Sequence, residues 1–204
     1  MNLKKLVTAA VCTMLMAAVA FTAGCGGEKK SDKKVLKVGM ECAYAPYNWS
    51  QTKADGGAVK IAGSNEYAYG YDVMMAKKLA DSMGADLEIH KIEWDGLAPA
   101  VVSGKIDAAI AGMSITSKRK ETVDFTKPYY YATVVALVKK DSEQAKAQSV
   151  ADLKGSVATS QLNTIWYDQI DQVPDVKKLP AIDTVPGMIV ALTSGKCNLI
   201  VTDI

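Results

Sequence analysis

The sequence predicts an α/β fold made of two consecutive units, and three observations lead to this prediction. Strand-like and helix-like patterns alternate along residues 35–111. The same alternation begins again at residue 156. Between the two units, residues 130–138 form an apolar run after Pro128 that is typical of a long strand. Alternating strands and helices favour parallel sheets with right-handed crossovers.

In the first unit, glycines mark the expected helix ends. Apolar residues recur at helical spacing between Gly70 and Gly84, and we expect the Met residues of this helix to fill the core. Residues 51–69 hold several Gly, Asp and Asn residues, which indicates a hairpin or a surface excursion. The expected elements are strand 35–40, a helix between Gly70 and Gly84, strand 86–92, helix 94–103 and strand 106–111.

The second unit repeats the pattern with capped helices. Residues 149–155 predict a short helix that Ser149 caps and Gly155 ends. Asp183 is expected to cap a longer helix that Gly195 stops. The remaining expected elements are strand 156–159, a helix over about 162–169, strand 176–179, a helix to Ser194 and strand 198–201.

The first 24 residues predict an export signal. Lys4 and Lys5 precede a short apolar stretch, and small residues then lead to Cys25. This ending resembles a bacterial lipobox, in which the Cys is acylated and becomes the mature N-terminus, although Thr22 stands where that motif usually has Leu. Residues 25–34 are Gly, Ser and charged after the Cys, which indicates a flexible tether. We therefore expect an extracytoplasmic chain, lipid-anchored to the outer face of the cell membrane.

Charge and cysteine content exclude several classes of function. The leader carries two of the 24 basic residues and no acidic one, so 22 basic residues face 22 acidic ones in the remainder. A neutral chain gives no sign of a nucleic-acid face. Cys42 and Cys197 each lie beside a different expected strand, and we expect two separate thiols rather than a disulfide. No Cys or His spacing indicates a metal site, and no cofactor is expected.

Residues 107–131 contain the candidate binding loop. A buried strand ends at Gly112, polar residues follow, and Arg119 lies among them before the chain becomes apolar again. Ligands of open α/β sheets bind at strand ends, and a guanidinium can hold a carboxylate through two parallel hydrogen bonds. The alternative is a surface loop with a solvated basic face. Similarly, the aromatic residues after Glu41 would form either a ligand-stacking wall or a lid on the core.

A family resemblance extends over nearly all of residues 35–204. It rests on four stretches, which read YAPYNW, GYDVMMAKKLA, IEWDGLAPAVV and SITSKRKETVDFTKPYYY. Together they resemble solute-binding protein family 3, the extracellular receptors of polar amino-acid ABC importers. The resemblance implies a periplasmic-binding-protein-like fold, with lobe 1 at residues 35–127, lobe 2 at residues 128–204 and a cleft between them. It also implies a free amino acid and importer permease subunits as partners of a monomer.

The resemblance further implies the role of each site residue. Arg119 would hold the α-carboxylate, with a hydroxyl and a backbone N–H from Thr164 at a helix N-terminus. Ser114, the Gly112 carbonyl and Asp203 would receive the α-ammonium. Tyr44 and Trp94 would form aromatic walls, and Glu41 would read a polar or cationic side chain such as that of Arg, Lys, His or Gln. No catalytic residue is implied.

Two departures from the family pattern follow from the same alignment of motifs. The loop that usually reads Gly-Thr-Thr is Leu162-Asn163-Thr164 here. Family members also continue beyond the position of Asp203, so we expect a C-terminal truncation in which lobe 1 lacks its returning strand.

Two other functions remain open at this stage. Secreted cyclohexadienyl or arogenate dehydratases use the same fold, and a sensor module could as well. Catalysis would need a general acid or base in the cleft. Glu41 and Asp203 are the carboxylates available there, and both have simpler binding roles, so the sequence favours a receptor that is not an enzyme.

Overall fold

The first lobe is built on a parallel sheet. The computed structural model describes residues 33–204, and β1 (Val35–Met40) lies at the centre of this sheet. It pairs in parallel with β6 (Asp86–Lys91) and β7 (Ala108–Ala109), which confirms the predicted arrangement. β7 is shorter than the predicted strand, because the backbone leaves the sheet before Gly112 and forms the candidate binding loop.

A second, antiparallel sheet belongs to the same lobe. Its strands are β2 (Ala43–Tyr44), β3 (Asn48–Gln51), β5 (Tyr67–Tyr69) and β4 (Val59–Lys60), in that order. The predicted hairpin region is therefore correct. The sheet also contains the aromatic segment after Glu41, since β2 and β3 pair with each other across a tight turn.

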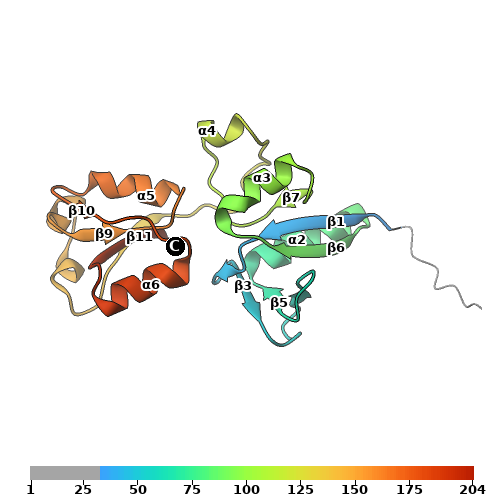
Figure 1. Ribbon diagram of the computed structural model, residues 1–204, viewed down its shortest axis with the longest axis horizontal. Helices are drawn as coiled ribbons and strands as arrows, with labels where there is room; N and C mark the ends of the chain where they lie inside the picture. Colours follow the sequence, from blue (N-terminus) through green and yellow to red (C-terminus); the bar gives the residue numbers. More distant parts are fainter. Residues whose placement is uncertain (1–32) are drawn as a thin grey trace, which may run out of the picture. The chain divides into compact units, whose positions relative to one another are not determined.

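Helix α2 (Tyr71–Met83) lies beside the strands of the first lobe (Figure 1). It buries small residues there rather than Met74 and Met83. It ends as predicted at Gly84, which adopts the left-handed φ of 62°. Val73, Ala76 and Ala80 are buried, whereas Met74 and Met83 are 50% and 55% exposed. The prediction that these Met residues fill the core is wrong. Alanines on the buried face let the helix approach the strands closely, so the larger side chains occupy the opposite face.

Short helical segments follow β6 and β7. The predicted helix over 94–103 is a 3₁₀ turn, η1 (Trp94–Gly96), that continues as α3 (Leu97–Val102). The candidate binding loop contains α4 (Ser117–Lys120). Three further 3₁₀ segments lie later in the chain: η2 (Glu143–Lys146), η3 (Val150–Leu153) and η4 (Ile170–Gln172).

The second lobe is a mixed sheet with a helix on each face. Its strand order is β10 (Lys177–Lys178), β9 (Val157–Thr159), β11 (Leu199–Asp203) and β8 (Val134–Leu137). β9 is parallel to β10 and β11, and β8 is antiparallel to β11. Figure 1 shows α5 (Ile165–Gln169) and α6 (Val185–Ser194) on opposite faces of this sheet. β8 is shorter than the predicted strand over 130–138.

The cap of α6 differs from the prediction by one residue. Thr184, rather than Asp183, is the N-cap, and its side chain accepts a hydrogen bond from the Gly187 amide at 3.2 Å. Pro186 follows in the first turn, where a missing N–H has no consequence. The helix stops at Gly195 as predicted.

Residues 33–204 belong to one compact unit that contains two hydrophobic cores. One core gathers residues of β1, β6 and α2, and the other gathers residues of β9, β11, α5 and α6. Tyr44 and Tyr47 of the first lobe pack into the second core. The fold is therefore α/β with two lobes, as predicted, while the boundary at residues 127 and 128 stays a prediction. Cys42 and Cys197 are both buried free thiols, which confirms that they do not pair.

Candidate ligand-binding site

Arg119 lies in the short helix α4 and is held by groups of its own loop. The Thr116 hydroxyl caps α4 by accepting a hydrogen bond from the Arg119 amide at 3.1 Å. The guanidinium Nη1 donates to the Ser114 carbonyl at 2.7 Å, and the guanidinium carbon lies 5.4 Å from the ring centre of Trp94. Burial lowers the pKa of Arg119, which nevertheless stays charged because arginine titrates far above neutral pH. The loop thus presents a fixed cation beside an aromatic wall.

Asn163 of the second lobe contacts the guanidinium of Arg119 directly. Arg119 Nη2 donates to the Asn163 carbonyl at 2.8 Å, and Trp94 Nε1 donates to the same oxygen at 3.4 Å. The Asn163 side chain donates to Asp95 Oδ1 at 3.0 Å. Its backbone has a φ of 54°, a left-handed value that Asn tolerates better than most residues. Sequence reasoning gave Asn163 no role, although it noted that the residue stands in place of a Thr.

Glu41 is a buried carboxylate at the end of β1. It is 5% exposed, and Gln161 Nε2 donates to its two oxygens at 3.0 and 3.2 Å. The same Gln161 nitrogen also donates to the Asp183 carbonyl at 2.9 Å. Burial raises the pKa of Glu41, the bond from Gln161 opposes that effect, and nearby Glu93 adds to it. Gln161 was not predicted, because nothing in its local pattern separates it from an ordinary strand-end residue.

Tyr44 and Asp203 form the third contact between the lobes. The Tyr44 hydroxyl donates to Asp203 Oδ1, and the Tyr44 ring stacks on Tyr47 with centroids 4.7 Å apart. Burial raises the pKa of Asp203, while hydrogen bonds from Tyr44 and Trp166 lower it. Burial also raises the pKa of Tyr44, so its hydroxyl stays a proton donor at neutral pH. The predicted aromatic wall is therefore also part of the core.

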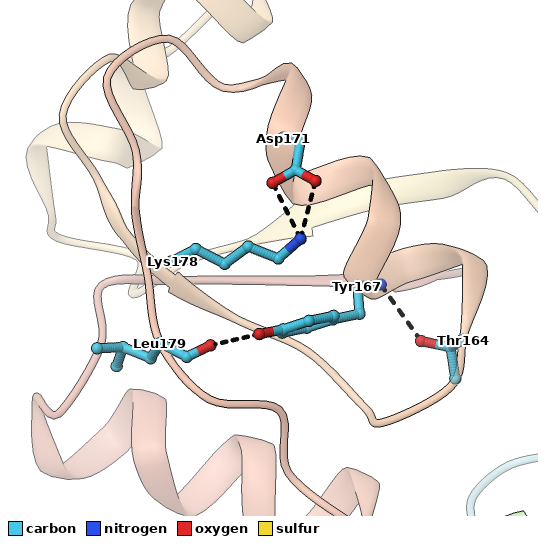
Figure 2. Close-up of polar contacts among 5 residues, drawn as sticks. All are labelled: Thr164, Tyr167, Asp171, Lys178 and Leu179. Atoms are coloured by element: carbon cyan, nitrogen blue, oxygen red, sulfur yellow. Dashed lines mark hydrogen bonds and ion pairs between the residues drawn. The ribbon is translucent and has the colours of Figure 1, made fainter.

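Thr164 is the N-cap of α5 and is buried. Its hydroxyl accepts from the Tyr167 amide at 3.3 Å and donates to the Gln161 carbonyl at 2.7 Å. Figure 2 shows how α5 is attached to β10 and the residue after it: the Tyr167 hydroxyl donates to the carbonyl of Leu179, which follows β10, at 2.9 Å. Lys178 Nζ lies 4.2 Å from the Tyr167 ring centre and 2.9 Å from Asp171 Oδ1. These contacts fix the position of Thr164.

The structure brings the predicted residues together in two adjoining pockets. Seven of the eight line one pocket of about 10 Å³: Glu41, Tyr44, Trp94, Gly112, Ser114, Arg119 and Thr164. Asp203 lines a neighbouring pocket of about 260 Å³. Tyr44, Gly112, Ser114 and Ile165 line both pockets. A volume of about 10 Å³ holds roughly one water molecule, so a free amino acid would have to separate some of the contacts between the lobes.

Within residues 33–204, no helix has the length and apolar character that a membrane crossing requires. In the same part of the chain, no group of three or more His, Cys, Asp or Glu side chains could hold a metal ion. The predicted signal peptide and the lipidation of Cys25 lie outside the described residues, as does nearly all of the predicted tether.

These features, a two-lobe α/β fold with a cation, carboxylates and aromatic side chains between the lobes, define a class of solute-binding proteins. Residues 36–182 match the bacterial extracellular solute-binding proteins, family 3. The chain belongs to this family, which confirms the resemblance inferred from the motifs.

Several similar proteins are named for an amino acid, and one is named for octopine. The chain is 30% identical over 197 residues to ABC transporter arginine-binding protein 1 of Escherichia coli (strain K12), a match that covers 96% of this chain and 70% of that protein. It is 33% identical over 140 residues to the arginine-binding extracellular protein ArtP of Bacillus subtilis (strain 168), covering 69% of this chain and 49% of that one. The chain thus spans about half the length of the second relative.

Solved structures of the same fold include two ancestral binding proteins, one of which is described as a precursor of an enzyme. An ancestral arginine-binding protein bound to glutamine has a TM-score of 0.71 at 32% identity, covering 84% of this chain and 70% of its own. The ancestral amino acid-binding protein AncCDT-1, described as a precursor of cyclohexadienyl dehydratase, has a TM-score of 0.70 at 32% identity, with coverage of 83% and 70%.

Proposed function

We propose that this chain captures a free polar amino acid outside the cytoplasm and delivers it to an ABC importer. One observation carries the proposal: Arg119 and Asp203, a cation and a carboxylate from different lobes, line adjoining pockets that share Tyr44, Gly112 and Ser114. A free amino acid carries the two complementary charges on one carbon atom. Family membership and the names of the relatives support the same reading.

In this proposal the ligand replaces contacts that the lobes make with each other. Its carboxylate takes the place of the Asn163 carbonyl at Arg119, and its ammonium takes the place of the Tyr44 hydroxyl at Asp203. The Gly112 carbonyl and Ser114 complete the ammonium site, and Thr164 adds to the carboxylate site. A zwitterion loses its hydration on entering the pocket, so charge-assisted hydrogen bonds must replace that hydration.

The side chain of the ligand would meet Glu41. This carboxylate is buried, and it accepts hydrogen bonds from the neutral side-chain amide of Gln161. A cationic or amide side chain could displace Gln161 and supply what the carboxylate lacks. We therefore propose arginine, lysine, histidine or glutamine as the ligand class. Two of the similar proteins are named for arginine, and a third, from Campylobacter jejuni, is named as a probable histidine-binding protein.

We propose binding without catalysis. Glu41 and Asp203 are the carboxylates that line the two pockets, and both already have binding roles in the proposed site. The relation of one structural neighbour to a dehydratase makes a direct assay worthwhile. The purified protein should leave prephenate and arogenate unchanged. Turnover that disappears in Glu41→Gln would overturn this part of the proposal.

We further propose that Cys25 carries the membrane anchor. A short apolar stretch, small residues and a Cys, followed by a polar tether, form the pattern on which this rests. The expected result is labelled fatty acid on the wild-type chain and globomycin-sensitive processing. A Cys25→Ser chain should be released from the membrane, and retention of that variant would contradict the anchor without affecting the ligand proposal.

The central experiment is a thermal-shift screen of the full chain against the twenty amino acids, followed by calorimetry with the best ligand. Ligands that bind only the folded state raise its melting temperature, and at equal concentration a tighter ligand raises it more. We expect the largest shift with a cationic or amide amino acid. The absence of any shift with all twenty would overturn the proposed function, and a largest shift with an acidic amino acid would overturn the role of Glu41.

A further inference from the structure

Asp72 is a buried carboxylate outside the proposed ligand contacts. It lies in the first turn of α2, is 0% exposed, and forms no ion pair within residues 33–204. Its oxygens accept two short hydrogen bonds, from Asn48 Nδ2 at 2.7 Å and from the Tyr129 hydroxyl at 2.7 Å. A buried carboxylate is unfavourable unless its partners are well placed, so the residues around it are tightly constrained.

Tyr129 connects Asp72 to the candidate binding loop through hydrogen bonds. Its hydroxyl donates to Asp72 and accepts a hydrogen bond from the Gly112 amide at 3.0 Å. Gly112 has a φ of 62°, a conformation that leaves its amide and carbonyl outside the regular hydrogen-bond pattern of β7. Tyr129 lies between α4 and β8, on the segment that leaves the first lobe for the second. One hydroxyl therefore joins the helix, the binding loop and the connection between the lobes.

Asn48 connects Asp72 in the same way to the segment next to Glu41. Its side-chain oxygen accepts a hydrogen bond from the Cys42 amide at 2.7 Å, while its nitrogen donates to Asp72. Cys42 has a φ of 57°, a left-handed value that is uncommon for this residue type. The backbone turns here immediately after Glu41 and before Tyr44. The carboxylate of Asp72 thus lies at the meeting point of two arms, one that ends at Gly112 and one that ends at Cys42.

We propose that Asp72 and Tyr129 are positioning residues for the ligand-binding loop. The chain of hydrogen bonds from Asp72 through Tyr129 to the Gly112 amide fixes the backbone at the N-terminal side of Gly112, the residue whose carbonyl receives the ligand ammonium. The arm through Asn48 fixes the turn that places Glu41 and Tyr44. Asp72 lines neither pocket, and Tyr129 lines the larger pocket without being one of the ligand contacts proposed above. This inference rests on the proposed function for its effect on affinity, but the positioning itself is testable without any ligand.

The first test measures amide hydrogen exchange in the full chain. Tyr129→Phe removes the acceptor of the Gly112 amide, so exchange at Gly112 should become about ten- to a hundredfold faster. Exchange in β6 and at Cys42 should stay as in the wild type, because the Asn48 arm is intact. Tyr131→Phe is the matched control, since Tyr131 is 83% exposed. A general loss of stability would speed exchange throughout the first lobe, and that result would overturn the positioning role.

A second variant tests the branching at the carboxylate. Asp72→Leu keeps the branched shape of the side chain but has no oxygen, so it can accept a hydrogen bond from neither Tyr129 nor Asn48. Exchange should therefore rise at both Gly112 and Cys42 in a variant whose β6 amides stay protected. Unchanged exchange at either amide would overturn the proposal. If either variant does not fold, fast exchange at Gly112 in the wild-type chain would overturn it and slow exchange there would support it.

The ligand test compares L-arginine with 5-guanidinopentanoate, which lacks the α-ammonium. Tyr129→Phe should lower the preference for L-arginine about tenfold, because the Gly112 carbonyl is no longer held toward the ammonium. Equal affinity losses for the two compounds would overturn the role in ammonium binding. If the wild-type chain does not bind L-arginine, the ligand class is wrong, and hydrogen exchange at Gly112 alone decides whether Asp72 and Tyr129 position the loop.

Discussion

Arg119 and Gln161 lie on opposite sides of the candidate site and are held in different ways. Arg119 belongs to the first lobe, and Thr116 and Ser114 of its own loop fix its backbone and its guanidinium. Gln161 belongs to the second lobe, and its side chain reaches across to Glu41. Asn163 and Asp203 of the second lobe likewise bond to first-lobe residues. Arg119 is thus held by contacts within the first lobe. Gln161, Asn163 and Asp203 of the second lobe are instead held by hydrogen bonds to residues of the first lobe.

This difference indicates how ligand would act on the two lobes. Groups that are fixed within the first lobe need no rearrangement to receive a ligand, which lowers the cost of binding. Groups of the second lobe must exchange a protein partner for a ligand partner. At the second lobe, the binding free energy is therefore only the difference between the contacts made with the ligand and the protein contacts that the ligand replaces. We expect substitutions in the first lobe to affect affinity more strongly than substitutions in the second.

The largest expected effect is that of Arg119→Ala. The substitution removes the cation and leaves the ligand carboxylate without its charge-assisted hydrogen bonds, so binding should weaken by about 3 kcal/mol, or more than a hundredfold. Calorimetry with the best ligand of the thermal-shift screen measures this loss. Lys118→Ala is the control, because Lys118 is an exposed neighbour in the same helix. Equal affinities of Arg119→Ala and the wild type would contradict the assigned role.

A smaller effect is expected for Glu41→Gln, which keeps the shape of the side chain and removes its charge. A cationic ligand should bind about 1.5 kcal/mol more weakly, since a charged hydrogen-bond partner becomes neutral. An amide ligand should lose less. Calorimetry with arginine and glutamine compares the two, and an equal loss for both ligands would contradict a role in reading the ligand charge.

The same variant has a pH signature in the ligand-free protein. Burial raises the pKa of Glu41 in the folded state above its ordinary value of 4.5. The stability that the protonated side chain contributes is fully present below that ordinary pKa and is lost as pH rises through the raised one. Glu41→Gln should therefore unfold at higher denaturant than the wild type at pH 7. The advantage should disappear below about pH 4.5, and an advantage that is constant with pH would contradict the buried, ionised carboxylate.

The sequence predicted the alternation of strands and helices in both lobes and eight of the residues that line the two pockets. Strand alternation and helix-stopping glycines are local signals, and Arg119 and Glu41 follow directly from the motifs around them. The sequence determines less well which face of a helix is buried. In α2, two faces carry apolar residues, and only packing selects Ala76 and Ala80 over Met74 and Met83.

The residues that sequence reasoning missed all act through long-range contacts. Gln161 lies 120 positions from Glu41, and Tyr129 lies 57 positions from Asp72. Asn163 acts through a left-handed backbone and a carbonyl, neither of which depends on a recognisable side-chain pattern. No spacing rule brings such pairs together before the fold is known.

The smallest expected effect distinguishes the two helix caps of the second lobe. Thr164 and Thr184 each cap a helix, with hydroxyl-to-amide distances of 3.3 and 3.2 Å. Replacing either with Ala should lower the free energy of unfolding by about 1 kcal/mol. Denaturant unfolding at pH 7 measures both losses. The Thr164→Ala variant should also bind ligand more weakly, because Thr164 lines the pocket with Arg119 and Thr184 does not.

The pair of variants thus separates a contribution to the fold from a contribution to the site. Thr184→Ala serves as the matched control, since it loses the same kind of cap from the same lobe. α5 is a helix of five residues, so its dipole adds little, and the loss of affinity should come from the hydroxyl and the local backbone. If both variants lose stability but neither loses affinity, Thr164 is a cap alone, and the carboxylate site rests on the first lobe.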